Sequence, residues 1–286
     1  MKILVTGATG GLGRLIIPEL LKHGHRVIAT SRSIDRAKSL TFFDQVEYFP
    51  YDICSKENID LFTYFGKPDS VIHLAWDKLN DYYSSSHLSE LLECHKEFIF
   101  NLIRNGLKDL NCAGTCYEYG LREGELNEAM VSDPVLPYSK AKNLLREYID
   151  TLKPNYNFSM KWIRIFFVFG EIYGRENLYT HLLKAISKKE KVFNMSGGEQ
   201  IRDFLTPEQV AEIFVSIATQ IRVQDIINCC SGKPVKLRDF INNFLKEHKL
   251  EIDLNLGYYP YLKYEPMALW GSVVKLRQVL ENNKNN

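Results

Sequence analysis

Short apolar runs rich in β-branched residues alternate with stretches of helical periodicity through the first half of the chain. The runs predicted to be strands are residues 3–6, 26–30, 46–49, 70–74, 110–113 and 161–166. Between them, apolar positions recur at helical spacing over residues 12–22, 88–105 and 138–152. This alternation predicts βαβ units, and therefore an α/β fold with a doubly wound parallel sheet and a ligand crevice at the carboxyl ends of the strands.

After Gly170 the pattern becomes looser. It predicts helices over residues 177–187, 207–219 and 237–248 and a short strand over 225–229. No internal repeat or flexible linker divides the chain. We expect a main domain over residues 1–166, to which 203–231 return, and a smaller substrate-binding lobe formed by 167–202 and 232–286.

Charge and composition limit the classes of partner that the protein is expected to bind. The 36 basic and 35 acidic residues nearly cancel, so the chain lacks the field that would attract nucleic acid or an anionic membrane. No apolar run approaches the roughly 18–20 residues of a membrane span, and the chain begins in a strand instead of a signal peptide. The six cysteines lack Cys-x-x-Cys spacing, so we expect no metal site, no disulfide framework and reduced thiols in a cytoplasmic protein.

A glycine-rich turn follows the first predicted strand. Gly7, Gly10 and Gly13 lie in the sequence TGATGGLG, directly before the first helix. Glycines at this spacing allow a tight turn and a close approach of a pyrophosphate to backbone amides at a helix N-terminus. The turn predicts a nicotinamide dinucleotide site of the Rossmann type.

The end of the second strand bears on the choice of dinucleotide. Ser31 and Arg32 stand where an acidic residue would bind the ribose 2′-hydroxyl of NAD, and they suit the 2′-phosphate of NADP better. Asp52, after the third strand, either faces the adenine or caps the next helix. The candidate cofactor-binding residues are Gly7, Thr9, Gly10, Leu12, Gly13, Ser31, Arg32, Asp52, Ile53, Leu74, Ala75, Tyr138 and Lys142.

Tyr138 and Lys142 supply candidate chemistry. They are four residues apart in a predicted helix, so both side chains lie on one face. A neighbouring ammonium favours the phenolate form of tyrosine, which allows the phenol to exchange a proton with an alcohol nearer neutral pH. Lys142 can also bind the nicotinamide ribose.

At this point the sequence resembles the extended short-chain dehydrogenase/reductase family, which acts largely on nucleotide-activated sugars. The resemblance runs through TGATGGLG, VIHLAW, AGTCYEYG, YSKAK, IRIFFVFG and GGEQIRDF. It implies that Thr115 is the hydroxyl residue that hydrogen-bonds the reacting oxygen. It also implies that Arg202 binds the substrate diphosphate and that Asn177 and Leu178 line the nucleotide site. Phe167 stands where the family usually has an asparagine that holds the substrate, so substrate binding is expected to differ there.

The resemblance also bears on the reaction. Cys116 and Tyr117 replace the acidic pair of the family's dehydratases, and the residue set of its 3,5-epimerases is incomplete. The segments GGEQIRDF and EPMALWGSVVKL look most like reductases that finish deoxysugars, such as CDP-abequose and CDP-paratose synthases of lipopolysaccharide O-antigen biosynthesis. The expected reaction is NADPH-dependent reduction of a nucleotide-linked 4-keto-6-deoxyhexose.

Two alternatives remain open, a nucleotide-sugar 4-epimerase that retains NAD and a non-catalytic NADP-binding sensor. His73 is interpreted as a hydrogen-bonded structural histidine. The long helices at 88–105 and 138–152 have family counterparts that form a four-helix contact, which predicts a homodimer.

Overall fold

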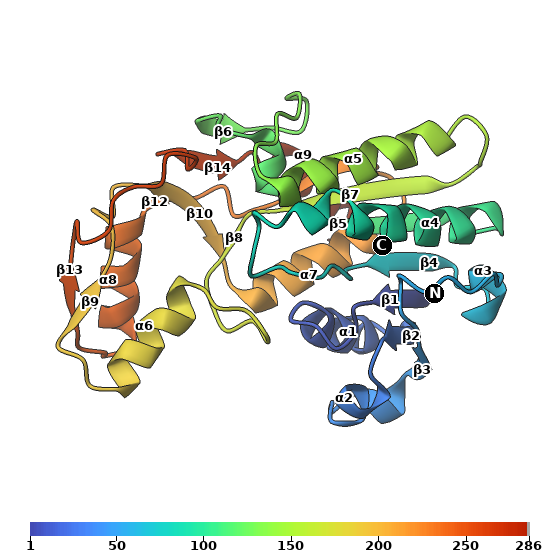
Figure 1. Cartoon of the computed structure of the whole chain (residues 1–286), viewed down its shortest axis with the longest axis horizontal. Coiled ribbons are helices and arrows are strands. Elements are labelled where there is room, and N and C mark those ends of the chain that lie inside the picture. Colours follow the sequence, from blue (N-terminus) through green and yellow to red (C-terminus); the bar gives the residue numbers. More distant parts are fainter. Residues whose placement is uncertain (285–286) are drawn as a thin grey trace.

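A seven-stranded sheet forms the centre of the computed structural model, which describes residues 1–284. Its strands are β1 (Lys2–Thr6), β2 (Arg26–Ser31), β3 (Glu47–Pro50), β4 (Ser70–His73), β5 (Asp109–Thr115), β7 (Ser159–Ile165) and β11 (Asp225–Cys229). They lie in the order β11-β7-β5-β4-β1-β2-β3, and every neighbouring pair is parallel. The chain winds from β1 to one edge and then from β4 to the other, so the predicted doubly wound α/β fold is confirmed (Figure 1).

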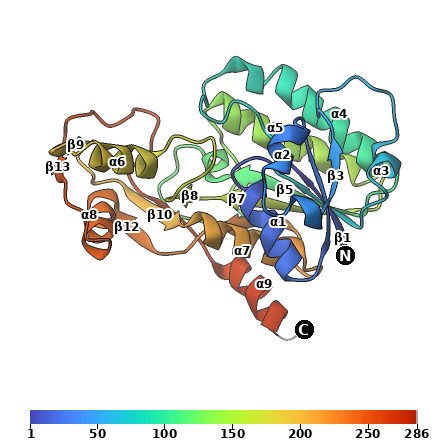
Figure 2. The same ribbon diagram turned by 90° about the horizontal axis from the view of Figure 1, so that it is seen from below.

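Helices cover both faces of this sheet (Figure 2). They are α1 (Gly13–Lys22), α2 (Ile34–Lys38), α3 (Leu61–Tyr64), α4 (Glu90–Arg104), α5 (Pro137–Leu152), α7 (Pro207–Ala218) and α9 (Val274–Lys284), with short 3-10 turns η1 (Phe43–Gln45), η2 (Ser85–His87) and η3 (Cys116–Tyr119). On one face α4 packs beside α5, and on the other α7 packs against both α1 and α9. Each face of the sheet therefore has its own apolar core.

A smaller lobe extends from one end of the sheet (Figure 1). It contains β8 (Phe167–Val168), β9 (Val192–Asn194), β10 (Ile201–Leu205), β12 (Pro234–Lys236), β13 (Asp253–Asn255), α6 (Leu178–Ser187) and α8 (Leu237–Glu247). Aromatic side chains fill its core, where the ring of Phe169 lies edge-on to those of Phe240 and Phe244. A separate two-stranded pair consists of β6 (Gly124–Leu126) and β14 (Leu269–Gly271), and β14 also contacts β10 of the lobe.

The C-terminal helix differs from the sequence-based expectation. We predicted that residues 232–286 belong to the smaller lobe, but α9 packs against α7 and β11 of the main domain. Leu276 and Val279 are buried in the core that α1 and α7 share. We predicted no helix after residue 248, so α9 was not identified as an element that returns to the main domain. Residues 285–286 of the predicted lobe lie outside the described residues.

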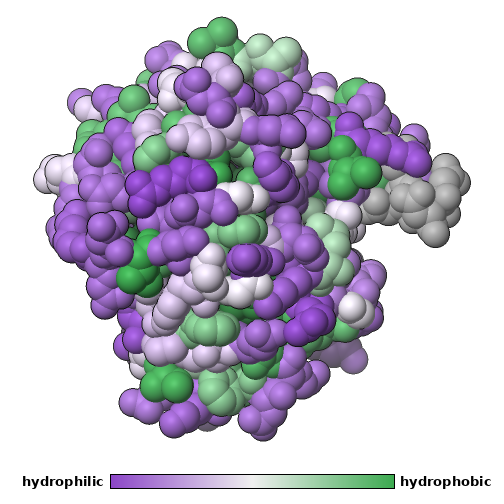
Figure 3. All heavy atoms as spheres, turned by 90° about the vertical axis from the view of Figure 1, so that its right-hand side faces the viewer, coloured by the Kyte–Doolittle hydropathy of each residue, from purple (hydrophilic) through white to green (hydrophobic). Residues whose placement is uncertain are grey.

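The surface at the far end of the main domain is mainly hydrophilic. Figure 3 shows its apolar side chains in small separate patches between charged and polar ones. Small scattered patches are ordinary for a folded domain and do not by themselves indicate a binding face.

Candidate active site

The glycine-rich turn lies at the carboxyl edge of the sheet, between β1 and α1. Gly7 has a φ of 68°, and a Cβ atom there would lie 2.9 Å from the amide nitrogen of Ala75. At Gly13 a Cβ would meet the carbonyl oxygen of Gly7. Leu12 is the N-cap of α1 and no side chain caps that helix, so its N-terminus can receive an anion. These features fit the pyrophosphate of a dinucleotide.

The end of β4 is fastened to this turn. The hydroxyl oxygen of Thr6 accepts hydrogen bonds from the amides of Leu74 and Ala75, both at 3.2 Å, and also bonds Nδ1 of His73 at 3.0 Å. Leu74 and Ala75 therefore lie beside Gly7. His73 is buried and hydrogen-bonded, in agreement with the structural role inferred for it.

The residues after β2 form a small polar cluster. Thr9 donates to the Ser31 hydroxyl at 3.1 Å, and that hydroxyl also bonds the phenol of Tyr48 at 2.8 Å. Arg32 makes a two-pronged ion pair with Asp77, at 2.9 and 2.8 Å. Sequence reasoning missed Asp77, because it reaches Arg32 from the loop after β4 and not from β2. A 2′-phosphate at this point would compete with Asp77 for Arg32.

The loop after β3 is held by its own hydrogen bonds and by a disulfide. Oδ1 of Asp52 accepts from the amide of Cys54 at 3.0 Å, so the carboxylate caps its own loop, beside Ile53. Cys54 is joined to Cys94 of α4. The expectation that all thiols are reduced is therefore wrong for this pair, while Cys112, Cys116, Cys229 and Cys230 are free and buried. The two paired cysteines are 40 residues apart, and no spacing rule connects them.

The predicted reacting residues come together from β5 and α5. Thr115 ends β5, and its hydroxyl accepts from the Tyr117 amide at 3.3 Å. Its own amide donates to Glu118, whose carboxylate is fully buried in an ion pair with Arg164 at 2.9 Å. This pair anchors the turn that presents Thr115. On α5, which packs against β5 and η3, Tyr138 and Lys142 lie one helical turn apart.

Aromatic rings surround Tyr138. The ring of Tyr82 stacks on it at 4.8 Å, and those of Trp76 and His87 lie edge-on at 6.2 and 5.4 Å. Burial raises the pKa of the Tyr138 phenol far above its usual range, and the same effect lowers the pKa of Lys142 to about 8. In this state Tyr138 keeps its proton, so it can act as a proton donor.

The segment between β8 and α6 contacts both the loop after β4 and helix α1. Arg175 donates to the Leu79 carbonyl at 2.8 Å and to the Tyr82 hydroxyl at 2.7 Å, which fixes the loop that covers Tyr138. Nearby, the guanidinium of Arg14 lies 3.5 Å from the ring centroid of Tyr173. Sequence reasoning did not identify Tyr82 or Arg175, because these contacts join residues more than 90 positions apart.

The candidate substrate-binding residues Phe167, Asn177 and Arg202 all make contacts with other side chains or backbone groups of the chain. Arg202 is 3% exposed, bonds Glu265 at 2.6 Å, and places its guanidinium 5.1 Å from the ring centroid of Phe167. Asn177 caps α6 and donates to the Gly170 carbonyl at 3.0 Å. The ring of Phe167 also lies edge-on to that of Tyr117, two residues after Thr115. Phe167 and Arg202 therefore border the reacting end, whereas Asn177 has a clear structural role.

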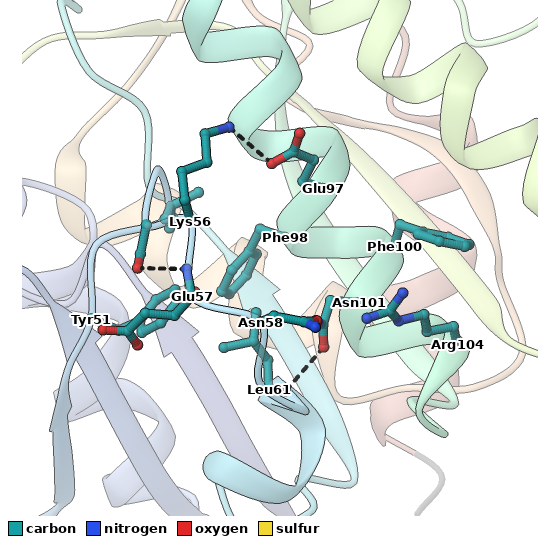
Figure 4. A pocket seen from close by; sticks show the side chains of 12 residues that line it. Tyr51, Lys56, Glu57, Asn58, Leu61, Glu97, Phe98, Phe100, Asn101 and Arg104 are labelled. Atoms are coloured by element: carbon teal, nitrogen blue, oxygen red, sulfur yellow. Dashed lines mark hydrogen bonds and ion pairs between the residues drawn. The ribbon is translucent and has the colours of Figure 1, made fainter.

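Another hollow, of about 230 Å³, lies between α4 and the loop after β3 (Figure 4). Its polar groups bond one another: Lys56 pairs with Glu97 at 3.2 Å, and Asn101 accepts from the Leu61 amide at 2.9 Å. We assign no ligand to this hollow. Within residues 1–284, no group of three potential metal-ligating side chains comes together, and no helix is long and apolar enough to cross a membrane.

Comparison with known proteins identifies the family. Residues 3–230 match the model of the NAD dependent epimerase/dehydratase family. The chain belongs to this family. The resemblance to extended short-chain dehydrogenases/reductases that the motifs indicated is thereby confirmed.

Two relatives come from Aggregatibacter actinomycetemcomitans. One, a dTDP-6-deoxy-L-talose 4-dehydrogenase (NAD(+)), is 31% identical over 95% of this chain and 100% of its own length. The other, a GDP-6-deoxy-D-talose 4-dehydrogenase, is 25% identical over 99% of this chain and 92% of its own. A crystal structure of UDP-glucuronic acid 4-epimerase from Bacillus cereus with UDP-glucuronic acid and NAD has a TM-score of 0.81 at 22% identity, covering 98% of this chain and 93% of that one. At that identity the likeness concerns the fold.

Proposed function

We propose that this family member is an NADPH-dependent oxidoreductase that reduces the 4-keto group of a nucleotide-activated 4-keto-6-deoxyhexose. The observation that carries the proposal is the placement of Tyr138 and Lys142 on one face of α5, with Thr115 at the end of the adjacent strand β5. The names of the two talose 4-dehydrogenases support the position and the sugar class. A 4-dehydrogenation run in reverse is the reduction of a 4-keto group.

The roles of the residues follow from their chemistry. When bound, the dinucleotide supplies a hydride to the carbonyl carbon. Tyr138 donates its phenolic proton to the carbonyl oxygen, so that hydride and proton together convert the ketone to an alcohol. Thr115 donates a hydrogen bond to the same oxygen as negative charge develops on it. Once Tyr138 has given up its proton it is a phenolate. The adjacent Lys142 ammonium stabilises that negative charge.

Cofactor preference is part of the same proposal. Ser31 and Arg32 would bind the adenosine ribose, and Arg32 would bind the 2′-phosphate of NADPH. Its present partner Asp77 is 45% exposed, and exposed ion pairs contribute about 0–1 kcal/mol, so a phosphate can displace it at small cost. One related talose dehydrogenase carries NAD(+) in its name, so NADPH and NADH are compared directly in the assay below.

The smaller lobe would bind the nucleotide sugar. Arg202 would bind its diphosphate after releasing Glu265, because a guanidinium binds phosphate oxygens in pairs. Arg202→Lys should then raise KM for the nucleotide sugar by about tenfold and leave NADPH affinity unchanged. An unchanged KM would remove Arg202 from the diphosphate site.

We also propose a cytoplasmic homodimer that joins through α4 and α5. The two helices pack side by side, and Leu144 of α5 is 42% exposed. Sedimentation velocity at micromolar concentration tests this arrangement, and a monomer across that range would contradict it. Leu144→Glu should shift a dimer toward monomer.

The deciding experiment follows NADPH oxidation with CDP-, dTDP-, GDP- and UDP-linked 4-keto-6-deoxyhexoses, with NADH in parallel. Net oxidation with one nucleotide series supports the ketoreductase. Interconversion of 4-hydroxyl epimers with no net change in NADPH or NADH would instead indicate a 4-epimerase. Dinucleotide binding with no turnover in any series would indicate a sensor.

A further inference from the structure

Trp76 lies beside Tyr138 and Lys142 and has no role in the reaction proposed above. It follows β4 in the loop that also carries Asp77, and its side chain is buried. Its indole ring stacks nearly parallel on the imidazole of His95, with ring centroids 4.3 Å apart and an interplanar angle of 3°. Its indole N–H donates to Nδ1 of His87 at 3.0 Å. Contacts from α4 and η2 therefore fix the orientation of the indole.

Lys142 lies against this ring. Its ammonium nitrogen is 4.0 Å from the Trp76 ring centroid, within the range of a cation–π interaction. The side chain is 2% exposed, and within residues 1–284 its ammonium has no protein hydrogen-bond acceptor or carboxylate partner. The indole face is thus the partner that the protein provides for this charge. The three N–H donors of the ammonium stay available to a ligand.

The other ionisable groups near Lys142 do not replace that partner. His73 and His95 bond each other at 2.9 Å, and burial lowers both of their pKa values, so both are neutral. Burial raises the pKa of the Cys112 thiol to about 12, so it also carries no charge. The titratable groups that act on Lys142 from the surrounding elements are His73 of β4, His95 of α4, Cys112 of β5 and Glu118 of η3. His87 of η2 and Tyr138 of α5 contact the Trp76 ring. Glu118 carries a charge, which is paired with Arg164.

We propose that Trp76 is a positioning residue that holds the Lys142 ammonium beside Tyr138 through the face of its indole ring. The ring attracts the charged form and not the neutral amine, so it keeps a buried lysine protonated without occupying its N–H donors. The catalytic consequence rests on the proposed function, but the contact itself can be tested in the protein without ligand.

The test is a titration of Lys142 by NMR in protein labelled at the lysine ε carbon, with Lys142→Arg used to assign the signal. Trp76→Leu removes the ring and should lower the midpoint of the titration by about half a pH unit to one unit. Trp76→Phe keeps an aromatic face and should give a smaller shift. Trp270→Leu, the same change in β14, is the matched control and should give none.

Fluorinated tryptophan provides a second variant that preserves shape if Trp76→Leu fails to fold. Incorporation of tryptophan with one, two or three ring fluorines weakens the ring's attraction for a cation, and the Lys142 midpoint should fall stepwise. The chain has three tryptophans, so the same series in Trp76→Phe protein identifies the ring responsible and should leave the midpoint constant. A midpoint that does not respond to fluorination in the wild-type chain would overturn the proposal.

The failure of this inference can be told apart from failure of the proposed function. If the Lys142 midpoint responds to Trp76 but no nucleotide sugar is reduced, the contact stands and the function is wrong. If substrate is reduced but the midpoint does not respond, the function stands and Trp76 only fills space. If both hold, the high-pH limb of kcat should move down with the NMR midpoint in Trp76→Leu.

Discussion

Tyr138 is the residue whose removal separates chemistry from binding most cleanly. Tyr138→Phe deletes one hydroxyl and keeps the ring that stacks on Tyr82, so the fold and the dinucleotide site should persist. We expect kcat to fall about 10²–10⁴-fold, the usual size of a general-acid contribution, with NADPH affinity nearly unchanged. Steady-state kinetics and a fluorescence titration with NADPH measure the two effects.

The matched control is Tyr148→Phe, the same deletion further along α5, where the ring lies 5.5 Å from the Lys96 ammonium. It should leave kcat unchanged. Wild-type turnover by Tyr138→Phe would remove this tyrosine from its proposed role.

Asp77 tests cofactor preference by a change of one charge. Asp77→Asn frees Arg32 from its ion pair and removes a carboxylate from the region where a 2′-phosphate would bind. The ratio of NADPH to NADH affinity should rise about threefold to fivefold, in line with the modest strength of exposed ion pairs. Calorimetric titration with each dinucleotide measures that ratio. Glu47→Gln, which breaks the exposed ion pair with Arg26, is the control, and an equal response in both variants would contradict the assignment.

The sequence predicted those site residues that local spacing connects. Gly7, Gly10 and Gly13 share one turn, and Tyr138 and Lys142 share one helix face. Trp76, Asp77, Tyr82, Arg175 and Glu265 escaped prediction because each reaches the site from a loop, across long stretches of sequence. The course of a loop depends on tertiary contacts. A loop has no periodic pattern of apolar residues from which those contacts could be predicted.

At the scale of elements, the longer helices and the central strands were predicted to within a few residues. The strands β6, β9, β12, β13 and β14 have three residues each, too few for an alternating pattern to show. Their partners are also remote, as β14 pairs with β6 across more than 140 residues. Residues 274–284 were assigned to the smaller lobe without a predicted helix, because the contacts that hold α9 against the main domain are made with α7 and β11, remote in the sequence.

The Cys54–Cys94 disulfide connects the loop after β3 to α4 and closes a chain segment of 40 residues. Reduction should therefore cost about 2–4 kcal/mol of the free energy of unfolding, because the unfolded chain regains the freedom that the link removes. We expect a lower melting temperature in dithiothreitol for the wild type. The double variant Cys54→Ser with Cys94→Ser should melt at the lower temperature with or without reductant.

Thiol counting in denaturant gives an independent check of the same link. Four of the six cysteines should react before reduction and six after it. Six reactive thiols at the outset, with no effect of reductant on melting, would show that the two cysteines are not joined.

At the scale of the whole molecule, two buried histidines should make stability depend on pH in mildly acidic solution. His73 and His95 bridge β4 and α4 in the core beneath the active site, and they are 1% and 3% exposed. Burial lowers the pKa of His73 to about 3 and that of His95 well below its usual value of about 6.5. The folded protein therefore leaves both imidazoles neutral where the unfolded chain protonates them.

The sign follows from this difference. As pH falls below about 6.5 the unfolded state binds two protons that the folded state does not, so stability is present above that pH and is lost below it. Each histidine should lower the free energy of unfolding by about 1.4 kcal/mol per pH unit, until the folded protein also takes up the proton near pH 3 for His73. Denaturant unfolding at several pH values between neutrality and pH ~4.5 should give a slope equivalent to about two protons.

The variants His73→Gln and His95→Gln should each reduce that slope by about one proton, because glutamine retains hydrogen-bonding groups but does not titrate. His248→Gln, at an exposed position after α8, should leave it unchanged. Since His73 bonds Thr6 at the end of β1 and His95 stacks on Trp76, protonation would disturb both the dinucleotide turn and the indole beside Lys142. Loss of dinucleotide affinity should therefore accompany the loss of stability on acidification. If the free energy of unfolding does not change with pH while dinucleotide affinity still falls on acidification, the titrating group lies in the binding site and not in the core.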